Sequence, residues 1–226
     1  MKNYFDHHSI SNSDITKLVQ MANPNYKEPE NLSEIFELGR LNHEALFEPH
    51  KAKGTIQDMM DRCASFEEEQ KVISDSKLAY AMADTVLKDE FCKKIIMMRD
   101  FRREFEWYYP SSNTLPLANT MGFESVRCKT DGDSGLLGTI FEFKGLKISS
   151  DKSFESALLH HDYDRSAFFY LNTTGYRWWL IVGVSKLDPR KIFKRLVDRD
   201  HLYYHSGREK LERAKVTYRQ LIGPVG

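Results

Sequence analysis

The stretch Phe123–Lys144 reads FESVRCKTDGDSGLLGTIFEFK. Apolar and β-branched residues fill both of its ends, and the turn-rich segment Gly132–Gly135 lies between them. That pattern predicts a β-hairpin or a bent pair of strands. Because side chains alternate across a strand, Glu142 and Lys144 share one face, and Asp131, at the end of the preceding strand, lies beside them.

An acid followed by Glu-x-Lys on a neighbouring strand suits metal-assisted cleavage of a phosphodiester. The Asp131 and Glu142 carboxylates offer oxygen ligands to a hard divalent cation. The Lys144 ammonium can orient a water or contact a phosphate. The same residues also fit a solvated hairpin face, since charged residues are usually exposed. The rest of the sequence has to decide between these two interpretations.

The composition excludes several classes of protein. The 226 residues carry 33 Lys and Arg against 33 Asp and Glu, so any DNA binding needs a local basic surface. The three cysteines are far apart and form no C-x-x-C pair, which excludes a disulfide framework and argues against a zinc site. No apolar run approaches the length of a membrane span and the N-terminus is polar, so we expect no membrane partner and no signal peptide. A reducing cytoplasm fits this chain best.

Periodicity predicts an α/β (α+β) protein in which a helical N-terminal part precedes a mixed central β-sheet flanked by helices. The helices are expected at residues 9–22, 32–47, 153–172 and 207–221, and at 55–98 in two pieces broken near Ser74–Ser76. The strands are expected at 101–109, 123–131, 137–144 and 178–184, with a loop at 110–122 and a strand or turn at 191–196. Pro49 is expected to stop the second helix. We predict one domain over residues 1–226, mainly helical in 1–98 and containing the sheet core, the site and the C-terminal helix in 99–226.

Four segments, in the same order, resemble motifs of the RecE-type exonucleases, a branch of the PD-(D/E)xK nuclease superfamily that also contains lambda exonuclease. Ile10–Ile15 (ISNSDI) is similar to an opening I-S-x-S-x-L helix. Glu37–Pro49 (ELGRLNHEALFEP) is similar to a G-x-x-x-H-x-x-L-x-E-P helix. Arg127–Asp131 followed by Glu142–Lys144 is similar to the paired-strand acidic motif, and Tyr163–Tyr170 (YDRSAFFY) is similar to a helix that carries Q-x-A-F-Y.

The resemblance implies a restriction-endonuclease-like core and DNA cleavage that depends on Mg²⁺ or Mn²⁺. It implies that His43, Asp131 and Glu142 hold the metal, and that Asp131, Glu142 and Lys144 form the catalytic set. In such relatives the reaction is 5′-to-3′ digestion of linear duplex DNA in phage-type recombination, and it feeds a single-strand annealing protein. Those relatives are ring-shaped oligomers, so a homo-oligomer is also expected here.

Two features of the resemblance leave a choice open. Ser166 stands where the family usually has a glutamine that supports the site or positions the substrate, and serine is shorter. The superfamily also carries an extra acid before the hairpin. Either Glu104 or Glu106 can supply it, because both project from one face of the strand predicted at 101–109. Glu104 is the preferred choice.

Basic residues after the hairpin are candidates for contacts with the DNA backbone. Lys147 and Lys152 flank the start of a predicted helix, where a phosphate can bind. From Lys186 to Arg219, eleven Lys and Arg stand against five Asp and Glu, a local charge of +6 with tyrosines interleaved. The expected contacts in that segment are Lys191, Lys194 and Arg195. A solvated amphipathic helix explains the same charges equally well.

Two other functions stay open on sequence grounds. A non-catalytic DNA-binding or assembly module that kept the fold is favoured by Ser166 and by the zero net charge, and opposed by the intact Asp131, Glu142 and Lys144. A structure-specific endonuclease would use the same site residues on a different substrate.

Overall fold

A five-stranded mixed sheet forms the centre of the protein. The computed structural model describes residues 9–110 and 125–222. The strands lie in the order β1 (Phe101–Pro110), β2 (Ser125–Ser134), β3 (Thr139–Leu146), β4 (Trp178–Ser185) and β5 (Ile192–Val197). Neighbouring strands are antiparallel except β3 and β4, which are parallel. The loop predicted at 110–122 lies almost entirely outside the described residues, as do the first two residues of the strand predicted at 123–131.

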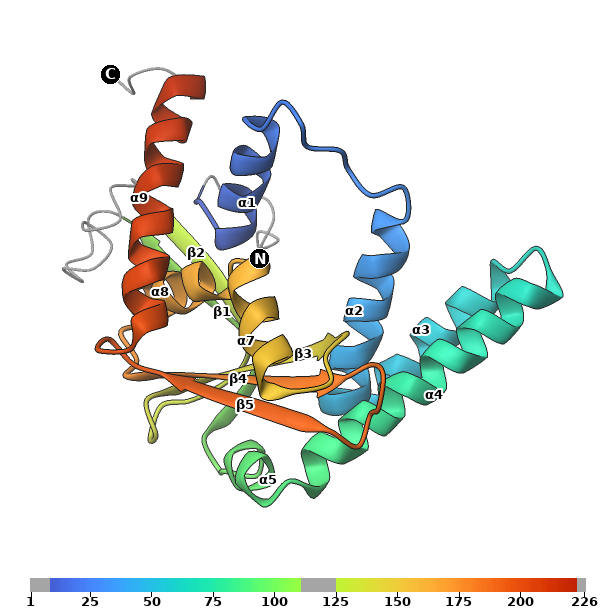
Figure 1. Cartoon of the computed structure of the whole chain (residues 1–226). Coiled ribbons are helices and arrows are strands. Elements are labelled where there is room, and N and C mark those ends of the chain that lie inside the picture. The colour runs from blue at the N-terminus through green and yellow to red at the C-terminus, as the bar shows by residue number, and fades with distance from the viewer. Residues whose placement is uncertain (1–8, 111–124, 223–226) are drawn as a thin grey trace.

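Helices cover both faces of this sheet (Figure 1), so the predicted mixed α/β class is confirmed. The helices of the described residues are α1 (Asn12–Met21), α2 (Leu32–Phe47), α3 (Pro49–Asp61), α4 (Phe66–Lys88), α5 (Glu90–Ile96), α7 (Asp151–His160), α8 (Tyr163–Thr174) and α9 (Leu202–Ile222). Helix α3 and the adjoining part of α4 extend away from the sheet as a helical hairpin. Across residues 9–110 and 125–222, no helix combines the length and the hydropathy that a bilayer crossing requires.

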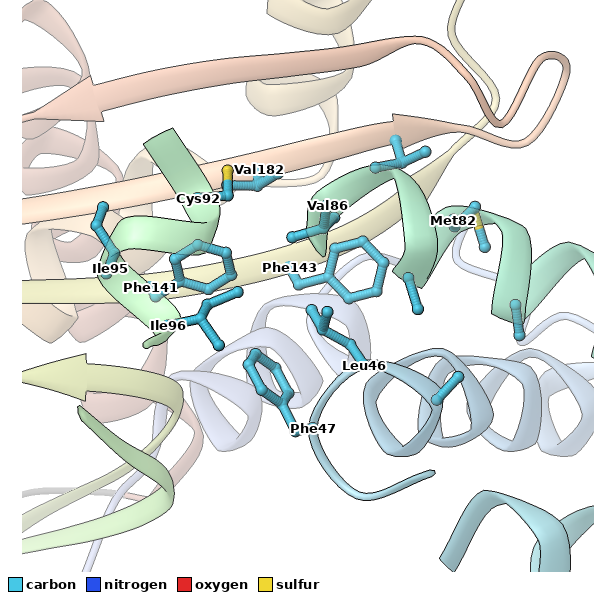
Figure 2. Close-up of a cluster of buried hydrophobic side chains, with 14 of the residues drawn as sticks. Leu46, Phe47, Met82, Val86, Cys92, Ile95, Ile96, Phe141, Phe143 and Val182 are labelled. Carbon is cyan, nitrogen blue, oxygen red and sulfur yellow. The ribbon is translucent and has the colours of Figure 1, made fainter. Parts of the chain in front are cut away.

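The alternation of side chains along β3 assigns each face of the sheet to different helices. Phe141 and Phe143 point to one side and pack with residues of α2, α4 and α5, among them Val86 (Figure 2). Ile140 and Leu146 point to the other side and pack with α7 and α8. Each large apolar side chain that is fully buried stabilises the fold by about 1.5–3 kcal/mol. The sheet is therefore the middle layer between two helical layers.

The parallel pair of strands requires a crossover connection, and α7 and α8 provide it. The helix predicted at 153–172 is in fact two helices. They separate at His161–Asp162, where Asp162 adopts a left-handed conformation with φ of 55°. The sequence of this segment contains no Gly or Pro that would have predicted the break.

Helix boundaries in the N-terminal part also differ from the prediction. Helix α4 passes through Ser74–Ser76 without a break, and the buried Ser76 hydroxyl is satisfied inside the helix by donating to the Val72 carbonyl (2.7 Å). The breaks occur instead at Ser65 and Asp89, whose side chains cap the helices that follow them. Pro49 both ends α2 and begins α3, since a proline is well tolerated at the first helical position.

Strand β2 continues past its predicted end. It pairs with β3 through Ser134, so the turn falls at residues 135–138 rather than at Gly132–Gly135. Gly138 has a φ of 57°, a conformation that glycine adopts without steric cost. The C-terminal helix begins at Leu202, five residues before its predicted start.

Helices α8 and α9 approach each other most closely at Gly207. A Cβ atom built there would lie 2.1 Å from the Asp164 carbonyl oxygen. By contrast, Gly54 in α3 has no atom within 4 Å of the corresponding position.

These two glycines are a matched pair for a stability measurement. We expect Gly207→Ala to lower the free energy of unfolding by about 1–3 kcal/mol, because the backbone of α8 has to move. Gly54→Ala should raise the free energy of unfolding by up to about 1 kcal/mol through helix propensity. Urea denaturation of both variants measures the two effects, and equal effects would show that α8 and α9 are not in tight contact.

Candidate active site

Strands β2 and β3 diverge at Asp131. Gly132 pairs with Phe141, and the two strands pair from there toward the turn but not in the other direction. In the gap, the Phe143 amide donates a hydrogen bond to Asp131 Oδ2 (2.8 Å). This side-chain acceptor replaces a backbone carbonyl of β2. On its other side β3 pairs with β4 along its whole length, from Thr139 to Leu146. The fork therefore opens space beside β3 while the Asp131 carboxylate satisfies the freed backbone donor.

His43 approaches the fork from α2. Buried residues on one side of this helix, among them Leu41 and Ala45, fix α2 against the sheet. The His43 Nδ1 atom lies 3.2 Å from Asp131 Oδ1, and Nε2 lies 3.2 Å from the Phe143 carbonyl oxygen. With a cation bound, a neutral ring that donates from Nε2 to that carbonyl would present the Nδ1 lone pair to the ion. Burial and the Lys144 charge lower the pKa of His43, but Asp131, Glu104 and Glu142 together raise it more, so the net pKa is raised.

Glu104, and not Glu106, belongs to this cluster. Glu104 Oε1 lies 3.6 Å from His43 Nδ1, and Glu104 Oε2 forms an ion pair with Lys129 (2.5 Å). Glu106 is exposed and accepts a hydrogen bond from the Tyr108 hydroxyl (3.2 Å). Burial raises the pKa of Glu104, but hydrogen bonds from His43 and Lys129 lower it to about 2.

The left-handed backbone of Glu104 explains why the two acids differ. Its φ is 51°, and the strand pairs on either side of it keep one register while Glu104 itself forms no ladder pair with Asp131. The alternation expected of a regular strand therefore does not apply at this residue.

Glu142 and Lys144 form a buried ion pair on the face of β3 that carries Ile140. The Lys144 Nζ atom donates to Glu142 Oε1 (2.8 Å) and lies 3.4 Å from Asp131 Oδ2. Burial and the charge of Asp131 raise the pKa of Glu142 to about 7. Burial also lowers the pKa of Lys144, but the Asp131 and Glu142 carboxylates raise it more, so the amine is protonated at neutral pH.

The donor atoms fit a hard divalent cation. His43, Glu104 and Asp131 each place one ligand atom within 4.8 Å of the others. Carboxylate oxygens suit Mg²⁺ and Mn²⁺, and Mn²⁺ also accepts imidazole. In addition, Glu142 Oε2 is buried and has no hydrogen-bond partner among the described residues, which is costly for a carboxylate oxygen unless a ligand satisfies it. The predicted metal ligands were His43, Asp131 and Glu142, whereas the three that lie together are His43, Glu104 and Asp131. Glu142 Oε1 is instead bound by Lys144.

A groove of about 470 Å³ opens from the cluster along α2 and α3. Its lining includes His43, Glu104 and Lys129 together with Phe36, Arg40 and Lys51. Sequence reasoning had assigned no role to Lys129. The signal for it was the spacing, because residues two apart on β2 share a face and Lys129 is two residues before Asp131.

Ser166 is tied to α1 and not to the acidic cluster. Its hydroxyl accepts a hydrogen bond from the Asn12 amide (2.9 Å) and donates to the Asp162 carbonyl (3.4 Å). These contacts fix α8 against α1. The resemblance implied that the residue at this position supports the site or positions the substrate, and for Ser166 that role remains a prediction.

The predicted DNA-backbone residues fall into two groups. Lys147 and Lys152 are exposed near the start of α7, which the Ser150 capping box begins. Lys194 and Arg195 are adjacent on the edge strand β5. Lys194 forms an ion pair with Asp89, which caps α5, and Arg195 forms one with Glu155 of α7, on the opposite side of the sheet. Lys191 is exposed just before that strand. The segment from Lys186 to Arg219 therefore remains a prediction as a DNA-backbone surface. Lys194 and Arg195 lie on opposite faces of β5, because side chains alternate there.

Comparison with known proteins relates this chain to solved structures only. No protein-family model matches the sequence, and neither does any curated protein. A crystal structure from Eubacterium rectale, described as a "Putative exonuclease", matches with a TM-score of 0.65 and 13% identity, over 100% of this chain and 88% of the other. The protein SSO0001 matches 94% of this chain and 87% of its own with 14% identity and a TM-score of 0.37, too low to indicate a common fold. The first likeness shows that the two proteins share a fold.

The choice between Glu104 and Glu106 can be tested by metal binding. Mn²⁺ at about a hundredfold excess over its Kd should stabilise the protein by about 2.7 kcal/mol, and we expect a rise in Tm of about 5–10 °C for a chain of this size. Asp131→Asn should abolish this rise and Glu104→Gln should reduce it, because each removes a charged ligand. Glu106→Gln is the matched control and should behave as the wild type. If Mn²⁺ raises the Tm of Glu104→Gln and Glu106→Gln equally, Glu104 is not a metal ligand.

Proposed function

We propose that this protein is a metal-dependent deoxyribonuclease that hydrolyses phosphodiester bonds directly, with no covalent intermediate. The observation that carries the proposal is the convergence of Asp131, Glu142 and Lys144 at the fork between β2 and β3, with His43 and Glu104 beside them. The shared fold with a protein described as a "Putative exonuclease" supports the same class of reaction.

The residues at the fork fit Mg²⁺ or Mn²⁺ as the cofactor. His43, Glu104 and Asp131 would hold the ion, and the unpartnered Glu142 Oε2 is the further donor. When bound, such a cation neutralises charge on the phosphate and lowers the pKa of a water.

Lys144 positions the attacking water in this proposal. An ammonium group has three N–H donors, and the Glu142 and Asp131 carboxylates lie within reach of two of them. The remaining donor is available to a water or to a non-bridging phosphate oxygen. Because the site is buried, this fixed charge acts through a low dielectric and its effect is larger than in water.

The groove beside the cluster is the proposed path of the cleaved strand. The groove is lined by the aromatic side chain of Phe36 and by the cationic side chains of Arg40, Lys51 and Lys129. Arg40 and Lys51 are paired with Glu44 and Glu48, and Lys129 with Glu104. A cation bound by Glu104 would compete for that carboxylate and leave Lys129 free to contact a phosphate.

An exonuclease acting on linear duplex DNA in phage-type recombination or repair is the specific form of the proposal. It rests on the four motifs in their order along the chain and on the neighbour's description. A single-strand annealing protein as partner, assembly into a homo-oligomer and a cytoplasmic location extend the proposal on the same resemblance.

The choice between exonuclease and endonuclease can be tested with linear and covalently closed circular forms of one plasmid. In Mg²⁺ we expect digestion of the linear form and survival of the circle. Labels placed separately at each 5′ and 3′ end report the polarity. Asp131→Asn is the inactive control. Cleavage of the circle at a rate similar to that of the linear form would identify an endonuclease, and no Mg²⁺-dependent cleavage of either form would reject the proposed function.

Lys144 can be separated from the metal ligands by substitution. Lys144→Ala should reduce cleavage on the order of 10²–10³-fold, because a positioned charge is lost. Without metal, the variant should be destabilised by about 3–5 kcal/mol, because buried carboxylates lose their cation.

A divalent ion should restore part of that stability without restoring cleavage. Thermal melts in EDTA and in Mn²⁺, with rate measurements alongside, separate the two effects. Lys77→Ala, at an exposed position on α4, is the control and should change neither quantity. If Lys144→Ala cleaves DNA at the wild-type rate, Lys144 has only a structural role as an ion-pair partner.

A further inference from the structure

Tyr163 is a polar residue near the site that neither the sequence motifs nor the metal cluster explains. It is the first residue of α8, directly after the left-handed Asp162. Its ring is half-buried and packs against the cluster of α7 and α8 that contains Ile140 and Leu146. Those two residues share a face of β3 with Glu142 and Lys144, since all four positions are even-numbered along the strand. Tyr163 is therefore on the same side of β3 as the catalytic ion pair.

The phenol and that ion pair also influence each other electrostatically. Burial raises the pKa of Tyr163, the Lys144 ammonium lowers it, and the Glu142 and Asp131 carboxylates raise it further. The influence is mutual, because Tyr163 also raises the pKa of Lys144. With a pKa above its usual value of about 10, the hydroxyl is protonated at neutral pH and can donate a hydrogen bond.

No residue among 9–110 and 125–222 accepts that hydrogen bond. The hydroxyls of Tyr108, Tyr176 and Tyr204 are each bound to a named side chain, whereas the Tyr163 hydroxyl has no such partner in the described part of the chain. Buried or half-buried tyrosine hydroxyls usually find one. The nearby Glu142 Oε2 also lacks a partner. A buried carboxylate oxygen and a half-buried hydroxyl, both without a partner among the described residues and both on the same side of β3, indicate a place where a polar ligand can bind.

We propose that Tyr163 is a further catalytic residue, whose hydroxyl donates a hydrogen bond to a non-bridging oxygen of the scissile phosphate. This inference rests on the proposed nuclease function. A phosphate that meets the site from the side of α8 would receive one hydrogen bond from Tyr163 and one from Lys144. Both donors are held by packing before the substrate arrives, so they stabilise the extra charge of the transition state without reorganisation.

Tyr163→Phe removes only the hydroxyl and leaves the ring to pack as before. Since that hydroxyl has no partner among the described residues, the Tm and the Mn²⁺-induced rise in Tm should match the wild type. We expect the single-turnover cleavage rate to fall on the order of 10²-fold. Tyr204→Phe is the matched control. Its hydroxyl donates to Asn172 Oδ1 (3.1 Å), so it should lose some stability and keep the wild-type rate.

A phosphorothioate substrate distinguishes contact with the phosphate from an indirect effect. Sulfur accepts hydrogen bonds poorly, so one of the two phosphorothioate diastereomers should slow the wild type more than it slows Tyr163→Phe. If the wild type is active, an unchanged cleavage rate in Tyr163→Phe would overturn the role of Tyr163, and so would equal sulfur effects in the two proteins. Either result would leave the proposed nuclease function standing. A wild type without metal-dependent cleavage would overturn the proposed nuclease function and this inference with it.

Discussion

The hydrogen bond from the Phe143 amide to the Asp131 carboxylate is the interaction on which the site depends. Where β2 and β3 part, one backbone donor of β3 would be left without an acceptor in a buried setting, at a cost of about 1–3 kcal/mol. Asp131 removes that cost with one oxygen, Oδ2, and turns its other oxygen toward His43. The carbonyl of the same residue, Phe143, accepts from the opposite side of the His43 ring. One peptide segment of β3 thus orients both the acid and the imidazole.

The second constraint is charge. Asp131, Glu142 and Glu104 bring three carboxylates into a largely buried region, and uncompensated buried charges cost several kcal/mol each. Two lysines offset them: Lys144 contacts Glu142 and Asp131, and Lys129 pairs with Glu104. The compensation is incomplete at Glu142, whose pKa is raised to about 7 mainly by burial. A divalent cation would supply the missing charge, so the electrostatics and the ligand chemistry favour the same occupant.

Local sequence patterns were sufficient for the strands, because alternation and turn residues are local. They placed Glu142 and Lys144 on one face correctly, since β3 is a regular strand. They could not place Lys194 and Arg195, because the ion pairs with Asp89 and Glu155 join residues 105 and 40 positions apart. They also assumed one regular strand at Glu104 and one continuous helix at Asp162, and neither residue type requires a break in its element.

The two places where regular periodicity failed are the two described non-glycine residues with positive φ, Glu104 and Asp162. A left-handed conformation costs a non-glycine residue on the order of 1–3 kcal/mol, less for Asp than for Glu, and persists only where the surroundings enforce it. At Glu104 it directs the carboxylate to His43, and at Asp162 it begins α8 so that Tyr163 is the first helical residue. Of these two strained residues, Glu104 belongs to the acidic cluster itself, whereas Asp162 forms ion pairs with Arg165 and Lys210. A regular β1 would avoid the strain at Glu104 but would not direct that carboxylate to His43, so the site accounts for the strain at this residue.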